Sequence, residues 1–170
     1  MSVIFPERFR MAAWASTLLA CMLLCTPLSV REAFAMKPAD LQQFASEYAA
    51  AWSSQDPEAL ASFYAADGVL IVNGGEPAVG RAAVAAKARS FMEAFPDMVV
   101  ALDRLDDRGH TVEFHWIWTG TNTGPGGTGN AVRLKGYEEW TFGPNGLIAR
   151  SDGHYDDADY QRQVNGEGGK

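Results

Sequence analysis

The chain has 170 residues, of which 47% are hydrophobic, 11% aromatic and 21% charged. This composition excludes a disordered chain, and the length fits one packed domain. The formal net charge of -7 excludes an extended basic surface that could neutralise nucleic-acid phosphates or bind an anionic bilayer. We therefore expect no nucleic-acid partner.

The first 35 residues have the order of a secretory signal peptide. Two arginines within residues 7–10 precede an apolar stretch at residues 11–28. Ala33-Phe34-Ala35 then supplies small residues at the two positions that a signal peptidase recognises. We expect cleavage after Ala35, which predicts a secreted or periplasmic protein without stable membrane association after cleavage.

Two other interpretations of this segment stay open. Residues 11–30 approach the roughly 20 residues that a membrane-spanning helix needs, so an uncleaved segment would be an anchor. Leu18-Leu19-Ala20-Cys21 also resembles a lipobox, the sequence at which bacteria cleave and lipidate the cysteine. Pro27 and the Ala-Phe-Ala site favour cleavage, and the apolar run continues past Cys21, which is unusual for a lipoprotein.

Cleavage after Ala35 would leave 135 residues and remove Cys21 and Cys25, the only two cysteines. The removed segment holds three arginines and two glutamates, so the net charge changes from -7 to -8. An exported domain without thiols has no disulfides, and its stability must come from its core.

Three helices are predicted in the first half of the mature chain. The first follows Pro38 and has one apolar, aromatic stripe. Asp56-Pro57 is typical of an N-cap and first helical position, and predicts a short second helix that carries Leu60, Phe63 and Tyr64 and ends at Asp67-Gly68. A β-type run at residues 69–72 and a turn at residues 73–77 precede a third helix, which begins after Gly80 and stops before Pro96. The stripe of the first helix consists of Leu41, Phe44, Tyr48 and Trp52.

From Met98 onward the pattern favours strands. Residues 98–105, 110–121, 131–142 and 147–155 are rich in β-forming residues and are separated by turn-forming clusters, as in consecutive hairpins. Helices followed by strands predict the α+β class, with helices against one face of an antiparallel sheet. We expect one domain over residues 36–162 and a disordered tail over residues 163–170.

Several segments of the mature chain together resemble a known family. The chain is similar to the SnoaL-like polyketide cyclase and ketosteroid isomerase group of the nuclear transport factor 2-like superfamily. The resemblance implies a cone, in which a curved antiparallel sheet wraps round N-terminal helices and leaves an apolar cavity at its wide end. It also implies a dimer formed through the outer face of the sheet. The segments that carry it are residues 63–70, 79–84, 91–97, 118–124 and 146–148, with Tyr155-Asp156 and Gln163.

The resemblance assigns chemistry to two residues. Tyr48 falls where ketosteroid isomerases place the tyrosine that binds the substrate oxygen, and Glu138 falls where they place a partner carboxylic acid. From the residues themselves, strand alternation puts Glu138 on one face with Trp140 and Phe142, so an apolar setting is expected to raise its pKa. The alternative is a solvated Glu138, or one paired with Arg133 or Lys135.

The chain departs from the family at two positions. The proton-moving aspartate of the isomerases corresponds to Val72, with Asn73 beside it, and the catalytic aspartate of the cyclases and limonene-epoxide hydrolases corresponds to Gly153. A shift of one residue would bring in Asp152, but such a shift also turns the side chain to the other face of the sheet. Asp152 is therefore the third and least secure catalytic candidate.

Aromatic residues dominate the expected interior. They are interpreted either as plain core or as the wall of a pocket for a flat, apolar ligand. Asp152, His154 and Asp156 alternate on one strand face, which fits a metal or acid–base site or, more simply, a solvated face. We expect no metal and no cofactor. The candidate pocket residues are Trp52, Tyr64, Phe91, Phe95, Met98, Trp116, Trp118 and Trp140.

Two functions follow from these observations. The first is an exported acid–base enzyme of the isomerase, cyclase or hydrolase type, which acts on a small apolar carbonyl compound, epoxide or ring through Glu138 and Tyr48. The second is a binder of a small hydrophobic ligand, or a dimeric scaffold, that has lost the catalytic aspartates. The substrate itself is not identified by the sequence.

Overall fold

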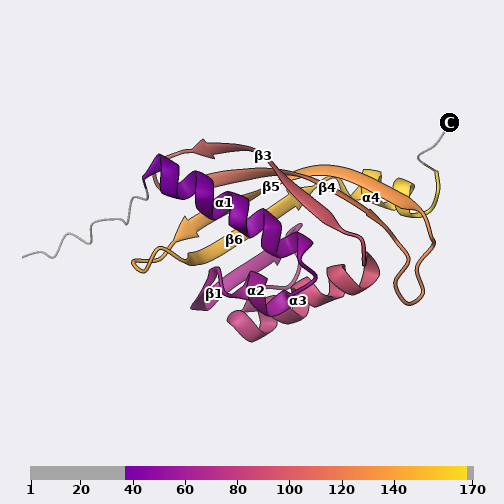
Figure 1. Cartoon of the computed structure of the whole chain (residues 1–170), viewed down its shortest axis with the longest axis horizontal. Helices are drawn as coiled ribbons and strands as arrows, with labels where there is room; N and C mark the ends of the chain where they lie inside the picture. Colours follow the sequence, from indigo (N-terminus) through magenta and orange to yellow (C-terminus); the bar gives the residue numbers. More distant parts are fainter. Residues whose placement is uncertain (1–36, 168–170) are drawn as a thin grey trace, which may run out of the picture. The chain divides into compact units, whose positions relative to one another are not determined.

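The computed structural model describes residues 37–167, which form four helices and one six-stranded sheet (Figure 1). The predicted signal peptide at residues 1–35 and the last three residues lie outside this range. No helix within residues 37–167 is long and apolar enough to cross a membrane. The strands follow the spatial order β2-β1-β6-β5-β4-β3.

The first two helices are α1 (Pro38–Ser53) and α2 (Pro57–Ala61). The predicted N-cap of α2 is confirmed, since the Asp56 carboxylate accepts hydrogen bonds from the backbone N–H groups of Glu58 and Ala59. The predicted length of α2 is wrong. The helix ends at Ala61, and Tyr64 already belongs to a strand.

Strand β1 (Tyr64–Val72) begins at Tyr64 and therefore includes residues 64–68, which periodicity had assigned to the second helix and its end. Tyr64 pairs with Ile148 of strand β6, and this long-range pairing replaces a further helical turn. Gly68 lies within the strand, and any Cβ there would stand 2.7 Å from the carbonyl oxygen of Ile148, so only glycine allows this close approach. The short strand β2 (Ala78–Val79) pairs antiparallel with β1 at the edge of the sheet.

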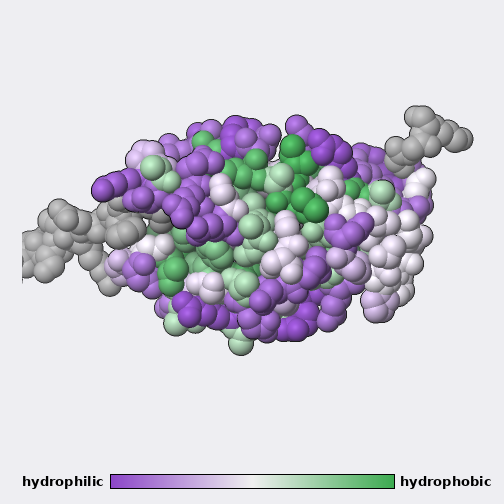
Figure 2. Space-filling model, viewed as in Figure 1, coloured by the Kyte–Doolittle hydropathy of each residue, from purple (hydrophilic) through white to green (hydrophobic). Residues whose placement is uncertain are grey.

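Helix α3 (Arg81–Ala94) follows Gly80, whose φ of 81° is in the region that favours glycine. It ends just before Phe95-Pro96, as predicted, because proline disfavours helical geometry in the preceding residue. Helices α1, α2 and α3 lie on the same side of the sheet in Figure 1. Apolar residues gather on the face shown in Figure 2, between α1 and the α2–α3 pair, and hydrophilic residues surround them.

Four consecutive antiparallel strands make up most of the sheet: β3 (Val99–Asp107), β4 (Val112–Thr121), β5 (Ala131–Phe142) and β6 (Ile148–Tyr155). They confirm the predicted hairpins and the α+β class. The one parallel pair, β1 with β6, was not predicted, and it brings residues about 80 positions apart into register.

A fourth helix, α4 (Asp157–Val164), follows the last strand. Asp156 caps it by accepting a hydrogen bond from the backbone N–H of Asp159. Gln163 binds the backbone of Arg133 in both directions, as acceptor at 2.7 Å and as donor at 3.1 Å. The predicted tail beginning at residue 163 is therefore placed too early, because the helix continues to Val164 and is tied to β5.

Candidate active site

Glu138 is the buried carboxyl at the centre of the candidate site. It lies on β5 between Phe114 of β4 and Gly153 of β6, its partners across the sheet. Alternation along β5 turns Glu138 and Trp140 to the covered face, and only 6% of the Glu138 surface is exposed. The predicted inward orientation of Glu138 is thus present, and neither Arg133 nor Lys135 pairs with it.

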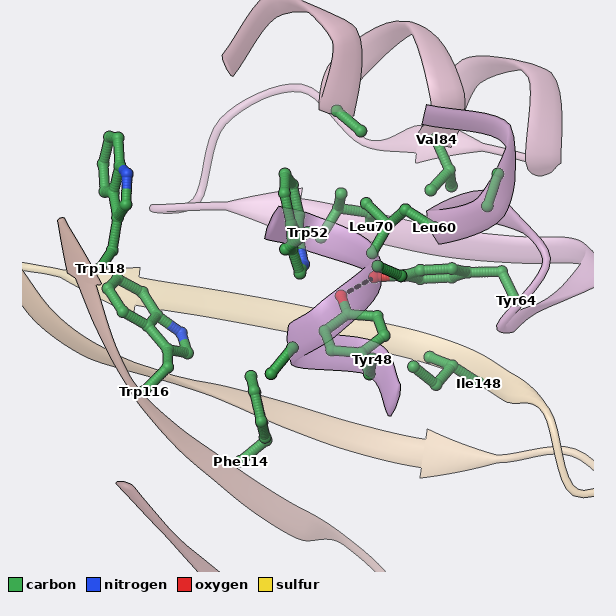
Figure 3. Packing of buried hydrophobic residues seen from close by; sticks show 14 of the residues in the cluster. Tyr48, Trp52, Leu60, Tyr64, Leu70, Val84, Phe114, Trp116, Trp118 and Ile148 are labelled. Atoms are coloured by element: carbon green, nitrogen blue, oxygen red, sulfur yellow. Dashed lines mark hydrogen bonds between the residues drawn. The ribbon is translucent and has the colours of Figure 1, made fainter. Parts of the chain in front are cut away.

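Three donors converge on one oxygen of this carboxyl. Glu138 Oε2 accepts hydrogen bonds from the Tyr48 hydroxyl at 2.8 Å, from Trp140 Nε1 at 3.0 Å and from the Ser151 hydroxyl at 2.6 Å. The Tyr64 hydroxyl lies 2.8 Å from that of Tyr48. Figure 3 draws the hydrogen bond between them as a dashed line. Because the single hydroxyl hydrogen of Tyr48 is directed to Glu138, Tyr64 is the donor in this second bond.

The other carboxyl oxygen, Oε1, receives none of these three bonds. Oε1 accepts no hydrogen bond from residues 37–167. It is nevertheless not fully buried, because Trp118 Nε1 is the only fully buried side-chain N or O atom in that range without a hydrogen-bond partner. Glu138 is also among the residues that line the cavity. With Oε2 already accepting three bonds, a proton bound to the carboxyl resides on Oε1, where a ligand can reach it.

Burial raises the pKa of Glu138 above the usual value for a glutamic acid, although the hydrogen bonds from Ser151, Trp140 and Tyr48 act in the opposite direction. Burial also raises the pKa of Tyr48, and the nearby Glu138 charge adds to the increase. Both tyrosine hydroxyls of the network therefore stay protonated around neutral pH. Of these groups, the Glu138 carboxyl is the one whose pKa is shifted toward neutral pH.

The cavity has a volume of about 70 Å³ and an almost entirely apolar wall. Most of the wall is buried, whereas Val72, Phe91, Val100 and Tyr155 are partly exposed and mark the opening. The engineered cavity that accepts benzene is about 150 Å³, so this cavity is too small to enclose a whole ring and holds either a smaller molecule or one end of a larger one that extends through the opening. The lining residues are Trp52, Leu70, Val72, Phe91, Met98, Val100, Trp116, Trp118, Glu138, Gly153 and Tyr155.

Five of the eight predicted pocket residues line this cavity: Trp52, Phe91, Met98, Trp116 and Trp118. The other three are buried beside it without forming its wall. Tyr64 and Trp140 bind the network behind Glu138, and the Phe95 ring packs edge-to-face on Trp118 at 4.8 Å between ring centroids.

Tyr48 meets Glu138, as the resemblance implies, but its hydroxyl is directed at that carboxyl and the residue is absent from the cavity wall. It therefore holds and polarises Glu138 in this structure and does not present its hydroxyl to a ligand. Tyr48 thus lies on α1 close to the carboxyl, as the resemblance implies. Its hydroxyl does not face the cavity, so the implied contact with a substrate oxygen is not formed in this arrangement.

Asp152 lies away from the cavity. Alternation along β6 turns Gly153 inward and Asp152 to the other face, where Arg150 binds both of its oxygens at 2.6 and 2.8 Å. His154, on the same face, stacks on Tyr137 at 4.8 Å between ring centroids. Asp156 is the cap of α4, so the three alternating residues of this strand end do not form one site.

Val72 and Gly153 both line the cavity, so the two positions to which the resemblance assigns catalytic aspartates face it here without a carboxylate. A Cβ on Gly153 would lie 3.6 Å from Cγ of Glu138, which shows how close this position is to the carboxyl. Within residues 37–167, Glu138 is the one carboxyl in the cavity wall.

Ser151 and Tyr155 were not predicted as site residues, although Tyr155 is among the residues that carry the family resemblance. Both lie on the inward face of β6 together with Gly153, at steps of two residues. The signal was available, because the family position at Gly153 fixes which face of the strand is inside, and alternation then adds residues 151 and 155.

One cluster on the outer face of the sheet has metal-ligand chemistry. Asp106, Glu113 and His115 place one ligand atom each within 4.8 Å of one another. Arg104 binds Asp106 and Arg108 binds Glu113, so both carboxylates already have cationic partners. A metal ion would have to displace these arginines, and the cluster is an ion-pair network of the surface.

A sheet with helices against one face, enclosing a small apolar cavity with a buried carboxyl, defines a small-molecule-binding fold of the nuclear transport factor 2-like kind. The family model of the SnoaL-like domain matches residues 45–151, and the chain belongs to this family. The predicted resemblance is thereby confirmed. No curated protein sequence matches the chain.

Solved structures show the same fold at low sequence identity. A ketosteroid isomerase-like protein from Catenulispora acidiphila DSM 44928, in complex with trimethylamine, is 18% identical, with 72% of this chain and 92% of that one covered and a TM-score of 0.65. A candidate SnoaL-like polyketide cyclase from Jannaschia sp. CCS1 is 16% identical, with coverage of 76% and 96% and a TM-score of 0.66. TerC, co-crystallised with polyporic acid, is 15% identical, with coverage of 74% and 97% and a TM-score of 0.60.

Proposed function

We propose that this domain binds a small, largely apolar molecule in the cavity and that Glu138 exchanges a proton with it through Oε1. The observation that carries this proposal is the setting of the carboxyl: three donors bind Oε2 and leave Oε1 free, and Glu138 lines an apolar cavity. The raised pKa of Glu138 supports it, since an acid–base group works best when its pKa lies near the working pH. The small molecules bound by two structural relatives are compatible with such a ligand.

For a carbonyl compound, ionised Glu138 would remove a proton from the carbon beside the carbonyl group. The C–H bond breaks, its electron pair forms the enolate, and the proton is held on Oε1 until it returns to the same or another carbon. For an epoxide, protonated Glu138 would give its proton to the ring oxygen as a C–O bond opens and water attacks the carbon. The added water then loses a proton, which returns to the Glu138 carboxylate and completes the diol. Either sequence balances without an oxidant or reductant.

The test is hydrogen exchange of single-ring ketones, including acetophenone, in D2O, followed by proton NMR. The wild-type protein should accelerate the loss of the signal from protons beside the carbonyl, and Glu138→Gln should lower that rate by about 10²–10⁴-fold, to the rate in buffer if no other group takes part. Glutamine keeps an oxygen for the three donors and removes only the ionisable group. Glu139→Gln is the matched control, because Glu139 is the exposed neighbour on the other face of β5.

A second function, that of a non-catalytic binder, is favoured by Val72 and Gly153. Both line the cavity at positions where an aspartate would otherwise supply a second catalytic group. Native mass spectrometry of protein isolated from its own compartment distinguishes the two. A co-purified compound that stays unchanged on incubation supports the binder, whereas its conversion supports the enzyme.

We also propose export, with residues 1–35 as a cleaved signal peptide. The support is the basic, apolar and Ala-Phe-Ala order of this segment. N-terminal sequencing of the protein recovered from the periplasm or medium should begin at Met36. A protein recovered in membranes with the segment intact, or lipidated at Cys21, would replace this proposal by an anchor or a lipoprotein.

We also propose a homodimer formed through the outer face of the sheet. On that face the Tyr137 ring lies between His115 and His154, at 5.4 and 4.8 Å between ring centroids. Such a half-buried aromatic row could pack against a second copy. Sedimentation should give twice the chain mass, and Tyr137→Asp should shift it to the monomer.

A further inference from the structure

Tyr155 lies at the inner face of β6 where the cavity opens. It is opposite Gly136 of β5, and the Trp116 ring occupies the space that a side chain at 136 would fill. Trp116 and Tyr155 consequently stand beside each other in the wall, with 6.5 Å between ring centroids. The glycine in the middle strand thus makes room for both rings.

The backbone of Tyr155 is fixed from two sides. It pairs with β5, and its N–H donates to Oδ1 of Asn73 at 2.9 Å. Asn73 in turn donates its own N–H to the carbonyl of Gly153 at 2.8 Å. The ring is therefore attached to a well-held strand end, on the same face as Gly153 and two residues further along.

The Tyr155 hydroxyl is a free donor. It forms no hydrogen bond within residues 37–167, and it is not a buried atom without a partner, so a ligand at the opening can reach it. Burial raises the pKa of Tyr155, with the charge of Asp157 adding to the increase, so the hydroxyl keeps its hydrogen at neutral pH. Glu138 and Tyr155 are the two residues of the wall with ionisable side chains.

The strand pairing places the two residues near each other in the wall. Glu138 is directly opposite Gly153, and Tyr155 follows two residues further along β6, about 7 Å away between Cα atoms. The carboxyl and the phenol therefore belong to neighbouring strands of the same cavity wall.

We infer that Tyr155 donates a hydrogen bond to an acceptor oxygen of the ligand, and that the ligand is a small compound with this oxygen at the cavity opening and an apolar part inside the cavity. The inference rests on the proposed function, because it names the substrate class of the same cavity. It moves the oxygen-binding role from Tyr48, whose hydroxyl is directed at Glu138, to a residue on the last strand. Tyr155 is then the residue that selects compounds with an oxygen function.

Acetophenone and ethylbenzene test this inference, because they share a ring and a two-carbon substituent, and only the first has the acceptor oxygen. Binding is followed by the indole N–H signals of ¹H–¹⁵N spectra, since Trp52, Trp116 and Trp118 line the cavity. Wild-type protein should bind acetophenone about fivefold more tightly than ethylbenzene, which corresponds to one hydrogen bond. Tyr155→Phe should abolish this preference and leave ethylbenzene binding unchanged. Tyr160→Phe is the matched control, because Tyr160 contacts the Tyr155 ring but is not part of the wall.

The outcomes separate this inference from the proposed function. If both compounds bind and Tyr155→Phe keeps the preference for acetophenone, the inference is overturned and the cavity remains a binding site. If Tyr155→Phe loses the preference but Glu138→Gln leaves hydrogen exchange unchanged, Tyr155 stands as the ligand donor and the catalytic role of Glu138 fails. If neither compound shifts any indole signal of the wild-type protein, both proposals fail.

Discussion

Tyr48→Phe is the substitution that probes the buried network most directly. It removes the bond from the Tyr48 hydroxyl to Glu138 Oε2, which has a charged acceptor when Glu138 is ionised, and it leaves the hydroxyl of Tyr64 without its partner. Loss of a hydrogen bond to a charged group costs about 1.5–3 kcal/mol, and an unsatisfied buried hydroxyl costs about 1–3 kcal/mol. The free energy of unfolding should thus fall by about 2.5–6 kcal/mol where Glu138 is ionised, and by about 1.5–4.5 kcal/mol where it holds a proton and the lost bond is between neutral groups.

Tyr64→Phe should cost much less, about 0.5–1.5 kcal/mol, because it removes one bond between neutral groups and leaves the Tyr48–Glu138 bond in place. The double variant should cost less than the sum of the two single variants, since it has no stranded Tyr64 hydroxyl. This coupling is the signature of a chain in which Tyr64 donates to Tyr48 and Tyr48 donates to Glu138.

Urea unfolding followed by circular dichroism at pH 7 measures all four proteins, with the slope of each transition checked for a common unfolded state. Equal losses for the two single variants, or strictly additive losses in the double variant, would refute the directional network. A Tyr48→Phe protein too unstable to measure would still be tested through the double variant, which must then be the more stable of the two.

Three further predictions follow from the site and its surroundings. Glu138→Gln should become more stable relative to wild type as the pH rises from the pKa of an unfolded glutamate through the raised pKa of folded Glu138. In that pH range the folded wild type binds a proton that the unfolded chain has lost, so wild type alone loses stability as the pH rises. Denaturation midpoints of both proteins across pH measure the effect, and a stability difference that does not change with pH would contradict it. Asp152→Asn should change the free energy of unfolding by less than about 1 kcal/mol and leave acetophenone binding intact, since it removes only an exposed ion pair with Arg150; a loss of binding in the same indole assay would return Asp152 to the site. Gly136→Ala should destabilise the domain by about 1–3 kcal/mol in a thermal scan, because its Cβ would overlap the Trp116 ring and the His154 carbonyl; an unchanged melting temperature would show that this strand can shift.

Local signals in the sequence predicted most of the fold. The periodicity after Pro38, the Asp56-Pro57 cap and the hairpins from residue 98 onward all concern neighbours in the chain, and all have counterparts in the structure. The end of the second helix was predicted wrongly, because Tyr64 pairs with Ile148 across 84 positions. No local pattern carries that information, and the tertiary pairing outweighs helical periodicity.

The candidate site divides in the same way. Alternation along β5 was enough to turn Glu138 inward, and alternation along β6 was enough to exclude Asp152. The meeting of Tyr48 with Glu138, 90 positions apart, came only from the family resemblance. Neither strand alternation nor the family resemblance could show in which direction the Tyr48 hydroxyl points. That direction depends on how Tyr64, Ser151 and Trp140 pack around Tyr48 and the Glu138 carboxyl.

The convergence on Oε2 also explains how a carboxyl can stay in this core. An ionised carboxylate in an apolar setting is costly unless it is hydrogen-bonded, and three donors on one oxygen supply that stabilisation. No cation neutralises Glu138 within residues 37–167, so its pKa remains raised and both protonation states stay within reach. An arginine in place of one donor would lower the pKa and fix the charge, whereas removal of the donors would raise the pKa further and fix the proton. The neutral donors of this network leave Glu138 between these two limits.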